Sequence, residues 1–142
     1  MDKVTVQGAF QVDFKVRDYE CDMQGIVNNS VYQNYLEHAR HEFLLSNNIN
    51  FAELARQKIN LVVLRAELDY KAPLTSGDAF FVEVVLAKAS RVRFDFLQKV
   101  IRKSDGKLML EAKVTGTSVN ERGRPFVPDV IANLMESIPE AH

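Results

Sequence analysis

The sequence has few of the residues that hold small proteins together through covalent or metal cross-links. It contains one cysteine, Cys21, and three histidines in 142 residues. A single cysteine excludes an internal disulfide and favours a reducing compartment, and the ligand spacing of a zinc finger is absent. A chain of this length buries roughly 70% of the surface that its unfolded form exposes, so a hydrophobic core suffices to stabilise it.

An excess of charge of one sign is also missing. Eighteen Lys and Arg residues stand against 19 Asp and Glu residues, which gives a net charge of −1. Such a chain has no general attraction for nucleic acid or anionic lipid, so we expect no nucleic-acid partner. No stretch approaches the ~18 uninterrupted apolar residues of a membrane span, and the N-terminus lacks a signal-peptide pattern. The sequence therefore predicts a cytoplasmic protein without a membrane span.

The first half of the chain predicts a strand, a loop and a long helix. Apolar residues make up 46% of the chain, and no repeat or linker divides it, so we expect one domain over residues 1–142. Residues 10–17 alternate in polarity, as in a strand, whereas residues 18–29 have no periodicity. From Ser30 to about Ser46, apolar residues recur at helical spacing, with Asn29 or Ser30 as the expected cap. A short helix is expected at residues 51–57.

The second half of the chain alternates with period two. This pattern predicts long strands at residues 60–70, 79–89, 92–102 and 107–120, followed by a short helix at residues 128–137. Alternation in the first of these strands places five residues on one face: Val62, Leu64, Ala66, Leu68 and Tyr70. The predicted fold class is α+β, with a curved five-stranded antiparallel sheet wrapped around the helix at residues 30–46. The strand at residues 60–70 is expected at an open edge, where it pairs with a second copy.

The loop before the long helix carries the chemistry. Asp22 lies just ahead of the helix N-terminus, and Gly25 allows the backbone to approach a ligand closely. The first helix amides, near Asn28 and Asn29, are unpaired donors at the positive end of the helix dipole. A carboxylate beside such amides suits attack on an acyl carbonyl, because one group activates the attacking oxygen and the other stabilises the negative charge that develops.

The same segment resembles the hotdog-fold acyl-CoA thioesterases of the 4-hydroxybenzoyl-CoA thioesterase-like superfamily. The resemblance extends over roughly residues 10–137. It rests on Cys-Asp-x-x-Gly-Ile-Val at residues 21–27, Val-Asn-Asn at residues 27–29, Tyr-Lys-Ala-Pro at residues 70–73, and Gly77-Asp78. Many short-chain members have a histidine where this chain has Asn29, and many Val-Asn-Asn members have one at Ile26. An auxiliary imidazole is therefore missing here.

The resemblance implies roles for seven residues. Asp22 is expected to be the catalytic carboxylate, as nucleophile or general base, and the amide of Asn29 to polarise the thioester carbonyl across a dimer interface. Gly25 and Asn28 are candidate substrate contacts. A basic cluster at a strand connection is expected to bind the phosphates of coenzyme A: Lys88, Arg91 and Arg93. The expected activity is hydrolysis of an acyl-CoA to free acid and coenzyme A, by a homodimer or a tetramer of such dimers.

Other interpretations remain open at this stage. An acyl carrier protein could replace coenzyme A as the acyl carrier, and a domain that binds acyl thioesters without hydrolysing them is a further alternative. A hydratase is disfavoured because no histidine lies between residues 1 and 37. His38 and His41 have no third ligand in place, so no metal is expected, and coenzyme A would be substrate and not a resident cofactor. Glu37 is either a water-orienting carboxylate or an ordinary surface residue.

Overall fold

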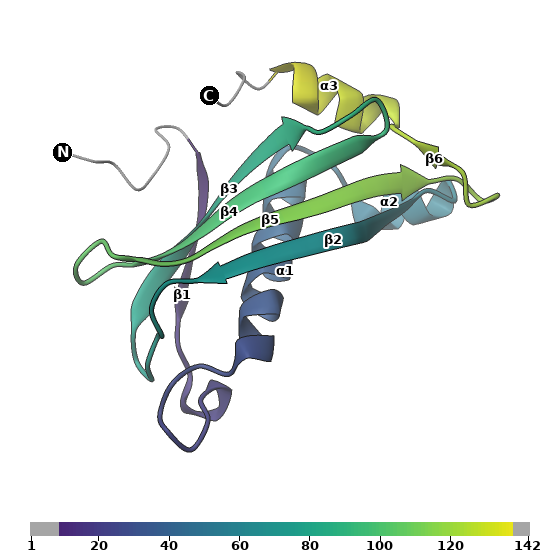
Figure 1. The fold of residues 1–142 in the computed structure, drawn as a ribbon. Helices are drawn as coiled ribbons and strands as arrows, with labels where there is room; N and C mark the ends of the chain where they lie inside the picture. The colour runs from purple at the N-terminus through teal and green to yellow at the C-terminus, as the bar shows by residue number, and fades with distance from the viewer. Residues whose placement is uncertain (1–8, 138–142) are drawn as a thin grey trace.

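A computed structural model describes residues 9–137 (Figure 1). The single domain expected over residues 1–142 therefore extends at both ends beyond the described residues. The elements in chain order are β1 (Phe10–Lys15), η1 (Asp18–Glu20), α1 (Asn29–Ser46), α2 (Phe51–Arg56), β2 (Asn60–Tyr70), β3 (Ala79–Lys88), β4 (Arg93–Arg102), β5 (Leu108–Val119), β6 (Pro125–Phe126) and α3 (Asp129–Ser137). The predicted elements are all present, with ends that shift by one or two residues.

The strands within the described residues form one antiparallel sheet in the order β1-β3-β4-β5-β2, and β6 pairs with β5. The antiparallel α+β class is thus confirmed; the five expected strands form the sheet, and the two-residue β6 adds a short sixth strand. Ser118 and Val119 of β5 pair with β2 on one side and with β6 on the other. β4 begins at Arg93, which lies opposite Thr117, so β6 occupies the same side of β5 directly beyond the start of β4.

A β-bulge changes the face that the first half of β2 presents. The register with β5 shifts between Val63 and Arg65, so Leu64 has no partner. Val63 lies opposite Gly116 and Ala66 lies opposite Val114. Since residues 114 and 116 share a face of β5, Val63 shares a face with Ala66, and the face predicted from regular alternation is wrong before the bulge.

Helix α1 packs against one face of the sheet, mainly on β1 and β3. Tyr32, Tyr35 and Leu36 of this helix are buried, and the two tyrosine rings contact rings of the sheet. The ring centroids of Tyr35 and Phe80 are 4.9 Å apart, and Phe14 stacks on Phe80 at 5.1 Å. Burial of one such large apolar side chain contributes about 1.5–3 kcal/mol to stability, so this contact fixes the helix on the sheet.

The two helices begin differently, although both have asparagine at the N-cap position. Asn50 accepts hydrogen bonds from the amides of Ala52 and Glu53 at 2.8 and 3.3 Å, and so caps α2. Asn28 is the N-cap of α1, yet its side chain makes no capping hydrogen bond. The expectation that Asn29 or Ser30 caps α1 is therefore wrong, and the amides of its first turn stay uncapped by Asn28.

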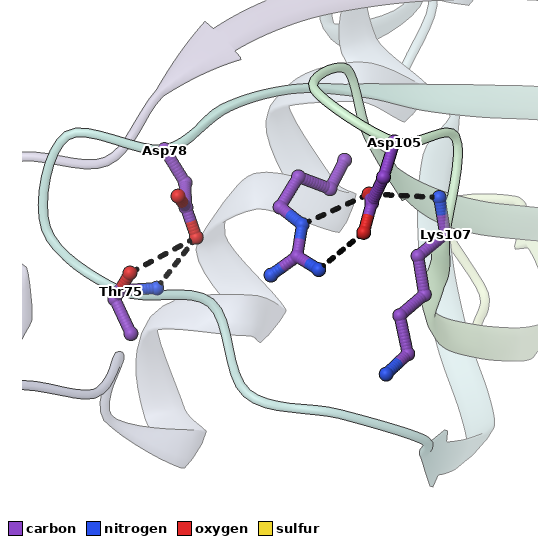
Figure 2. A network of polar contacts seen from close by, with 5 residues as sticks. Thr75, Asp78, Asp105 and Lys107 are labelled. Atoms are coloured by element: carbon purple, nitrogen blue, oxygen red, sulfur yellow. Dashed lines mark hydrogen bonds and ion pairs between the residues drawn. The ribbon is translucent and has the colours of Figure 1, made fainter.

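Turns held by aspartates lie at the end of the sheet nearest the start of α1. Figure 2 shows Asp78 accepting hydrogen bonds from the amide and hydroxyl of Thr75, at 2.9 and 3.2 Å. In the β4–β5 hairpin, Asp105 accepts from the guanidinium of Arg102 and the amide of Lys107. The Arg102 guanidinium lowers the pKa of Asp105 to about 2. The turn that Asp78 holds is the one against which the loop before α1 rests.

Strand β2 forms an open edge of the sheet. Its side chains include apolar residues that are about half exposed in the single chain: Val63 at 56%, Leu64 at 48% and Tyr70 at 47%. A long edge strand with exposed apolar residues is a surface for pairing with another chain. Pairing with a second copy through β2 remains a prediction. Within residues 9–137 no helix has the length and apolar character that crossing a membrane requires.

Candidate active site

The loop before α1 is closed by its own backbone. Cys21 and Val27 form an antiparallel bridge, and the amide of Asp22 donates to the carbonyl of Ile26 at 2.9 Å. Ile26 also bridges to Thr75, in the turn that Asp78 holds. The loop is therefore built like a small hairpin and is anchored to the end of the sheet.

The loop amides orient the carboxylate of Asp22. Its Oδ1 accepts hydrogen bonds from the amides of Gln24 at 2.8 Å and Ile26 at 3.4 Å. Within residues 9–137 no hydrogen bond reaches Oδ2, and the residue is exposed. One oxygen thus holds the carboxylate in place, and the other is available to a substrate or to water.

Gly25 meets a backbone requirement. Its φ is +81°, and its amide donates to the carbonyl of Asp22 at 3.0 Å. A Cβ added at Gly25 would meet no atom within 4 Å. Glycine is therefore favoured at this position by its positive φ, and not by crowding from neighbouring atoms. Gly25 is therefore required by the geometry of the turn, whereas its contact with substrate stays a prediction.

We expect Gly25→Ala to destabilise the protein by about 1–2 kcal/mol, because an alanine is strained in the left-handed region. Gly25→Asn is expected to recover much of this loss, since asparagine tolerates that region better. Denaturant unfolding of both variants measures the difference. If both unfold at the wild-type midpoint, the loop does not depend on the backbone geometry of Gly25.

The N-terminus of α1 lies directly after this loop. The amide of Asn28 donates to the carbonyl of Glu20 at 3.0 Å, which sets the direction in which the helix begins. A helix offers no internal acceptor for its first amides, so the amide of Asn29 is a donor at the positive end of the helix dipole. The hydroxyl of Tyr70 lies 3.5 Å from the carbonyl oxygen of Asn29, which brings the end of β2 to the same place.

Glu20 fastens the loop to α1, and sequence reasoning missed it. Its Oε1 accepts from the hydroxyl of Tyr35 at 2.7 Å and from the amide of Arg17 at 2.8 Å. Burial, followed by this hydrogen bond to Glu20, raises the pKa of Tyr35. Tyr70 was also not predicted as a site residue. No sequence signal identifies either contact, because each joins residues from separate elements.

A small cavity of about 120 Å³ lies between α1 and the inner face of the sheet. Its lining is mostly apolar and comprises Leu44, Phe51, Leu61, Val62, Val63, Phe94, Phe96, Val114 and Gly116, with Glu37, Arg40 and His41 from α1. A Cβ on Gly116 would come within 3.0 Å of the Phe94 ring and of the Val62 carbonyl oxygen. The absence of a side chain at Gly116 therefore lets the Phe94 ring and the β2 backbone approach β5 closely in the cavity wall.

Arg40 is the polar residue that is most deeply placed in this cavity wall. It is 8% exposed, and its guanidinium Nη1 donates to Oε1 of Gln98 at 3.1 Å. The amide nitrogen of Gln98 donates in turn to the carbonyl of Leu36 at 3.0 Å. Burial lowers the pKa of Arg40. The wall thus carries a guanidinium whose position is fixed by a buried amide.

The remaining polar candidates do not form a second reactive centre among the described residues. His38 lies 3.7 Å from Glu42, and no group of three His, Cys, Asp or Glu that could hold a metal occurs within residues 9–137. Burial raises the pKa of the Cys21 thiol, which disfavours the thiolate that a nucleophile requires. Glu37 lies at the cavity, about two helical turns from Asn29.

The basic cluster lies far from Asp22 within one chain. Lys88, Arg91 and Arg93 are exposed at the β3–β4 turn. The opposite end of β3 begins at Ala79, next to the turn that contacts the loop, and ten strand residues span roughly 30 Å. Figure 1 shows the loop before α1 and the β3–β4 turn at opposite ends of the sheet. The structure therefore brings Asp22, Gly25, Asn28 and Asn29 together, but leaves the basic cluster apart from them.

The chain matches a family model and several known proteins. The family model of the thioesterase-like superfamily matches residues 16–135. The chloroplastic acyl-acyl carrier protein thioesterase ATL2 of Arabidopsis thaliana is 38% identical over 120 residues, which is 84% of this chain and 64% of that protein. The long-chain acyl-CoA thioesterase FadM of Escherichia coli is 27% identical over 105 residues, 74% of this chain and 79% of that protein. The chain thus spans less than two thirds of the Arabidopsis relative.

A solved structure confirms the architecture. Slr0204, a 1,4-dihydroxy-2-naphthoyl-CoA thioesterase from Synechocystis, superposes with a TM-score of 0.83 at 20% identity. The match covers 90% of this chain and 96% of that one. At this identity the likeness shows the fold, and the family model supplies the membership. The chain belongs to the thioesterase-like superfamily and has the hotdog fold of its members.

Proposed function

We propose that the protein hydrolyses an acyl thioester, with acyl-CoA as the substrate and free acid and coenzyme A as the products. The observation that carries this proposal is the placement of Asp22, whose carboxylate is held through Oδ1 beside the uncapped first turn of α1. A positioned carboxylate and an oxyanion-binding amide are the two groups that acyl transfer to water requires. Membership of a thioesterase family supports the same reaction.

In the proposed reaction Asp22 acts on the attacking oxygen. As general base, its Oδ2 takes a proton from water while the water oxygen bonds to the thioester carbon. The amide of Asn29 donates to the carbonyl oxygen, which becomes negative in the tetrahedral intermediate. The C–S bond then breaks, and the leaving sulfur takes the proton. As nucleophile, Asp22 would instead bond to the thioester carbon while the C–S bond breaks and the thiolate leaves, and water would hydrolyse the resulting mixed anhydride to the free acid and the carboxylate of Asp22.

The acyl group is assigned to the cavity between α1 and the sheet. Glu37, Arg40 and His41 follow Asn29 by 8 to 12 positions, so they lie roughly 12–18 Å along the helix from the reacting end. The cavity of about 120 Å³ is smaller than the ~300 Å³ lower bound of typical ligand pockets. We infer that a second copy completes it, because β2 contributes to its wall and is an open edge.

A dimer paired through β2 would also bring the basic cluster of one copy close to Asp22 of the other copy. Antiparallel pairing of β2 with the same strand of a second copy sets the Asn60 end of one chain beside the Tyr70 end of the other. The end of the sheet that holds Arg91 and Arg93 then lies beside the Asp22 loop of the other copy. One site would use the carboxylate of one chain and the cations of its partner.

Arg91→Ala with Arg93→Ala is expected to raise KM for acyl-CoA several-fold and to leave kcat nearly unchanged. Exposed ion pairs to phosphate are individually worth about 0.2–1 kcal/mol, and they weaken at high salt. The control is a pantetheine thioester without the nucleotide phosphates, on which the double variant should match the wild type. An equal loss on both substrates would withdraw the phosphate-binding role from these residues.

An acyl carrier protein is the second candidate carrier. The ATL2 and ATL3 proteins of Arabidopsis thaliana, 38% and 39% identical to this chain, carry the name acyl-acyl carrier protein thioesterase. A panel of acyl groups, each presented on coenzyme A and on acyl carrier protein, separates the candidates when thiol release is followed with a thiol-detecting reagent. Binding of thioesters without thiol release would support the non-catalytic alternative.

A further inference from the structure

A second basic turn lies beside the predicted phosphate-binding cluster. The β5–β6 turn carries Arg122 and Arg124, both exposed. Residues 88–93 and 120–126 together contain five Lys or Arg residues and one acidic residue, Glu121, in a chain whose net charge is −1. We define these five cations, Lys88, Arg91, Arg93, Arg122 and Arg124, as the two-turn basic surface.

The sheet register places the two turns next to each other. Arg93 of β4 lies opposite Thr117, and Phe126 of β6 lies opposite Ser118, so both strands use consecutive positions on the same side of β5. The hydroxyl of Thr117 also donates to the carbonyl of Val92 at 2.5 Å. The β3–β4 turn and the β5–β6 turn are therefore fastened to one segment of β5.

The second turn is rigid and its cations are not engaged. Oδ1 of Asn120 accepts from the amides of Arg122 at 2.9 Å and Arg124 at 3.1 Å. None of the five cations forms an ion pair with another of the described residues, and Glu121 pairs with Lys58 at 3.4 Å. The surface thus presents its charge to solvent on a fixed backbone.

We propose that the two-turn basic surface docks the acidic surface of an acyl carrier protein, with Arg122 and Arg124 as the contacts that distinguish this carrier from coenzyme A. This inference rests on the proposed thioester hydrolysis and names the partner for it. The phosphates of coenzyme A need only the cations of one turn, whereas an acidic protein surface can contact both turns at once. Complementary charge of this extent accelerates association and selects the partner.

An apolar residue next to the surface also favours a protein partner. Val130, in the first turn of α3, is about half exposed, and α3 follows β6 and packs on β3 (Figure 1). Protein interfaces combine charged rims with apolar contacts, which a half-exposed valine can provide. Val130 therefore extends the surface in a way that fits a protein partner.

The test compares one acyl group on two carriers. Arg122→Ala with Arg124→Ala is expected to lower kcat/KM for the acyl carrier protein thioester by roughly 5–10-fold at low salt, and for the acyl-CoA by less than about twofold. The difference should shrink at high salt, because exposed attraction is screened. Lys107→Ala, which removes a charge from the hairpin at the opposite end of the sheet, is the control and should change neither carrier.

A second readout makes the docking independent of catalysis. Fluorescently labelled holo acyl carrier protein is titrated with the wild type and with the double variant, and its anisotropy gives Kd. Weaker binding of the carrier protein by the variant than by the wild type supports the inference. If no thioester is hydrolysed in the same preparation, the proposed function is wrong while the docking inference still holds. The inference is overturned if the double variant loses kcat/KM equally on both carriers, or loses none on the carrier protein thioester. It is also overturned if the wild type hydrolyses acyl-CoA but does not bind the carrier protein.

Discussion

Asp22→Asn is expected to lower kcat by roughly 10²-fold or more while KM stays near the wild-type value. The substitution keeps the size of the side chain, and the amide oxygen can still accept from the amides of Gln24 and Ile26. The loop is therefore retained, and only the charge and basicity of the carboxylate are lost. Steady-state kinetics of thiol release measure the effect.

Asp18→Asn is the matched control for this prediction. Asp18 is also an exposed carboxylate in the segment between β1 and α1, and its Oδ1 accepts a hydrogen bond from the hydroxyl of Ser76. Asparagine can accept the same bond, so this variant should turn over nearly normally. Near-normal turnover by Asp22→Asn, or an equal loss in Asp18→Asn, would remove Asp22 from the reaction.

Leu64→Lys is expected to give a monomer that has lost roughly tenfold or more of its activity. Leu64 is about half exposed in the single chain and does not line the cavity assigned to the acyl group, so a lysine is tolerated there in the folded monomer. In a dimer paired through β2 this lysine would be buried without a partner, which costs several kcal/mol. Sedimentation of the variant, with activity measured at the same concentration, tests the prediction.

Leu45→Lys serves as the control for the edge variant. Leu45 is also about half exposed, but it lies near the C-terminal end of α1 and is not part of the β2 edge. The control should keep both the oligomeric state and the activity of the wild type. An active monomer, whether of the wild type or of the edge variant, would show that one chain forms the whole site.

The sequence predicts the elements well and the irregularities poorly. The bounds of β2 follow directly from the run of alternating residues, because strand periodicity is a local property. The bulge at Leu64 depends on the register with β5, which no local pattern contains. β6 has two residues, too few to show alternation, and its pairing with Ser118 and Val119 is a tertiary contact.

The candidate site shows the same division. Asp22, Gly25 and the first turn of α1 are neighbours in the chain, so their proximity could be predicted from the motif. The distance of Arg91 and Arg93 from Asp22 is set by the length and direction of β3, and sequence reasoning did not foresee it. The contacts of Glu20 with Tyr35 and of Tyr70 with Asn29 join residues 15 and 41 positions apart, and they emerge only from the fold.

Thiol release from an acyl-CoA panel by the wild-type protein, with the free acid quantified alongside, tests the central claim most directly. The proposed function predicts that at least one acyl-CoA gives one thiol and one acid per turnover, and that Asp22→Asn at the same concentration gives at least roughly 10²-fold less of both. Acyl-CoA that binds to the wild type without release of thiol or acid, across the whole panel, would contradict it.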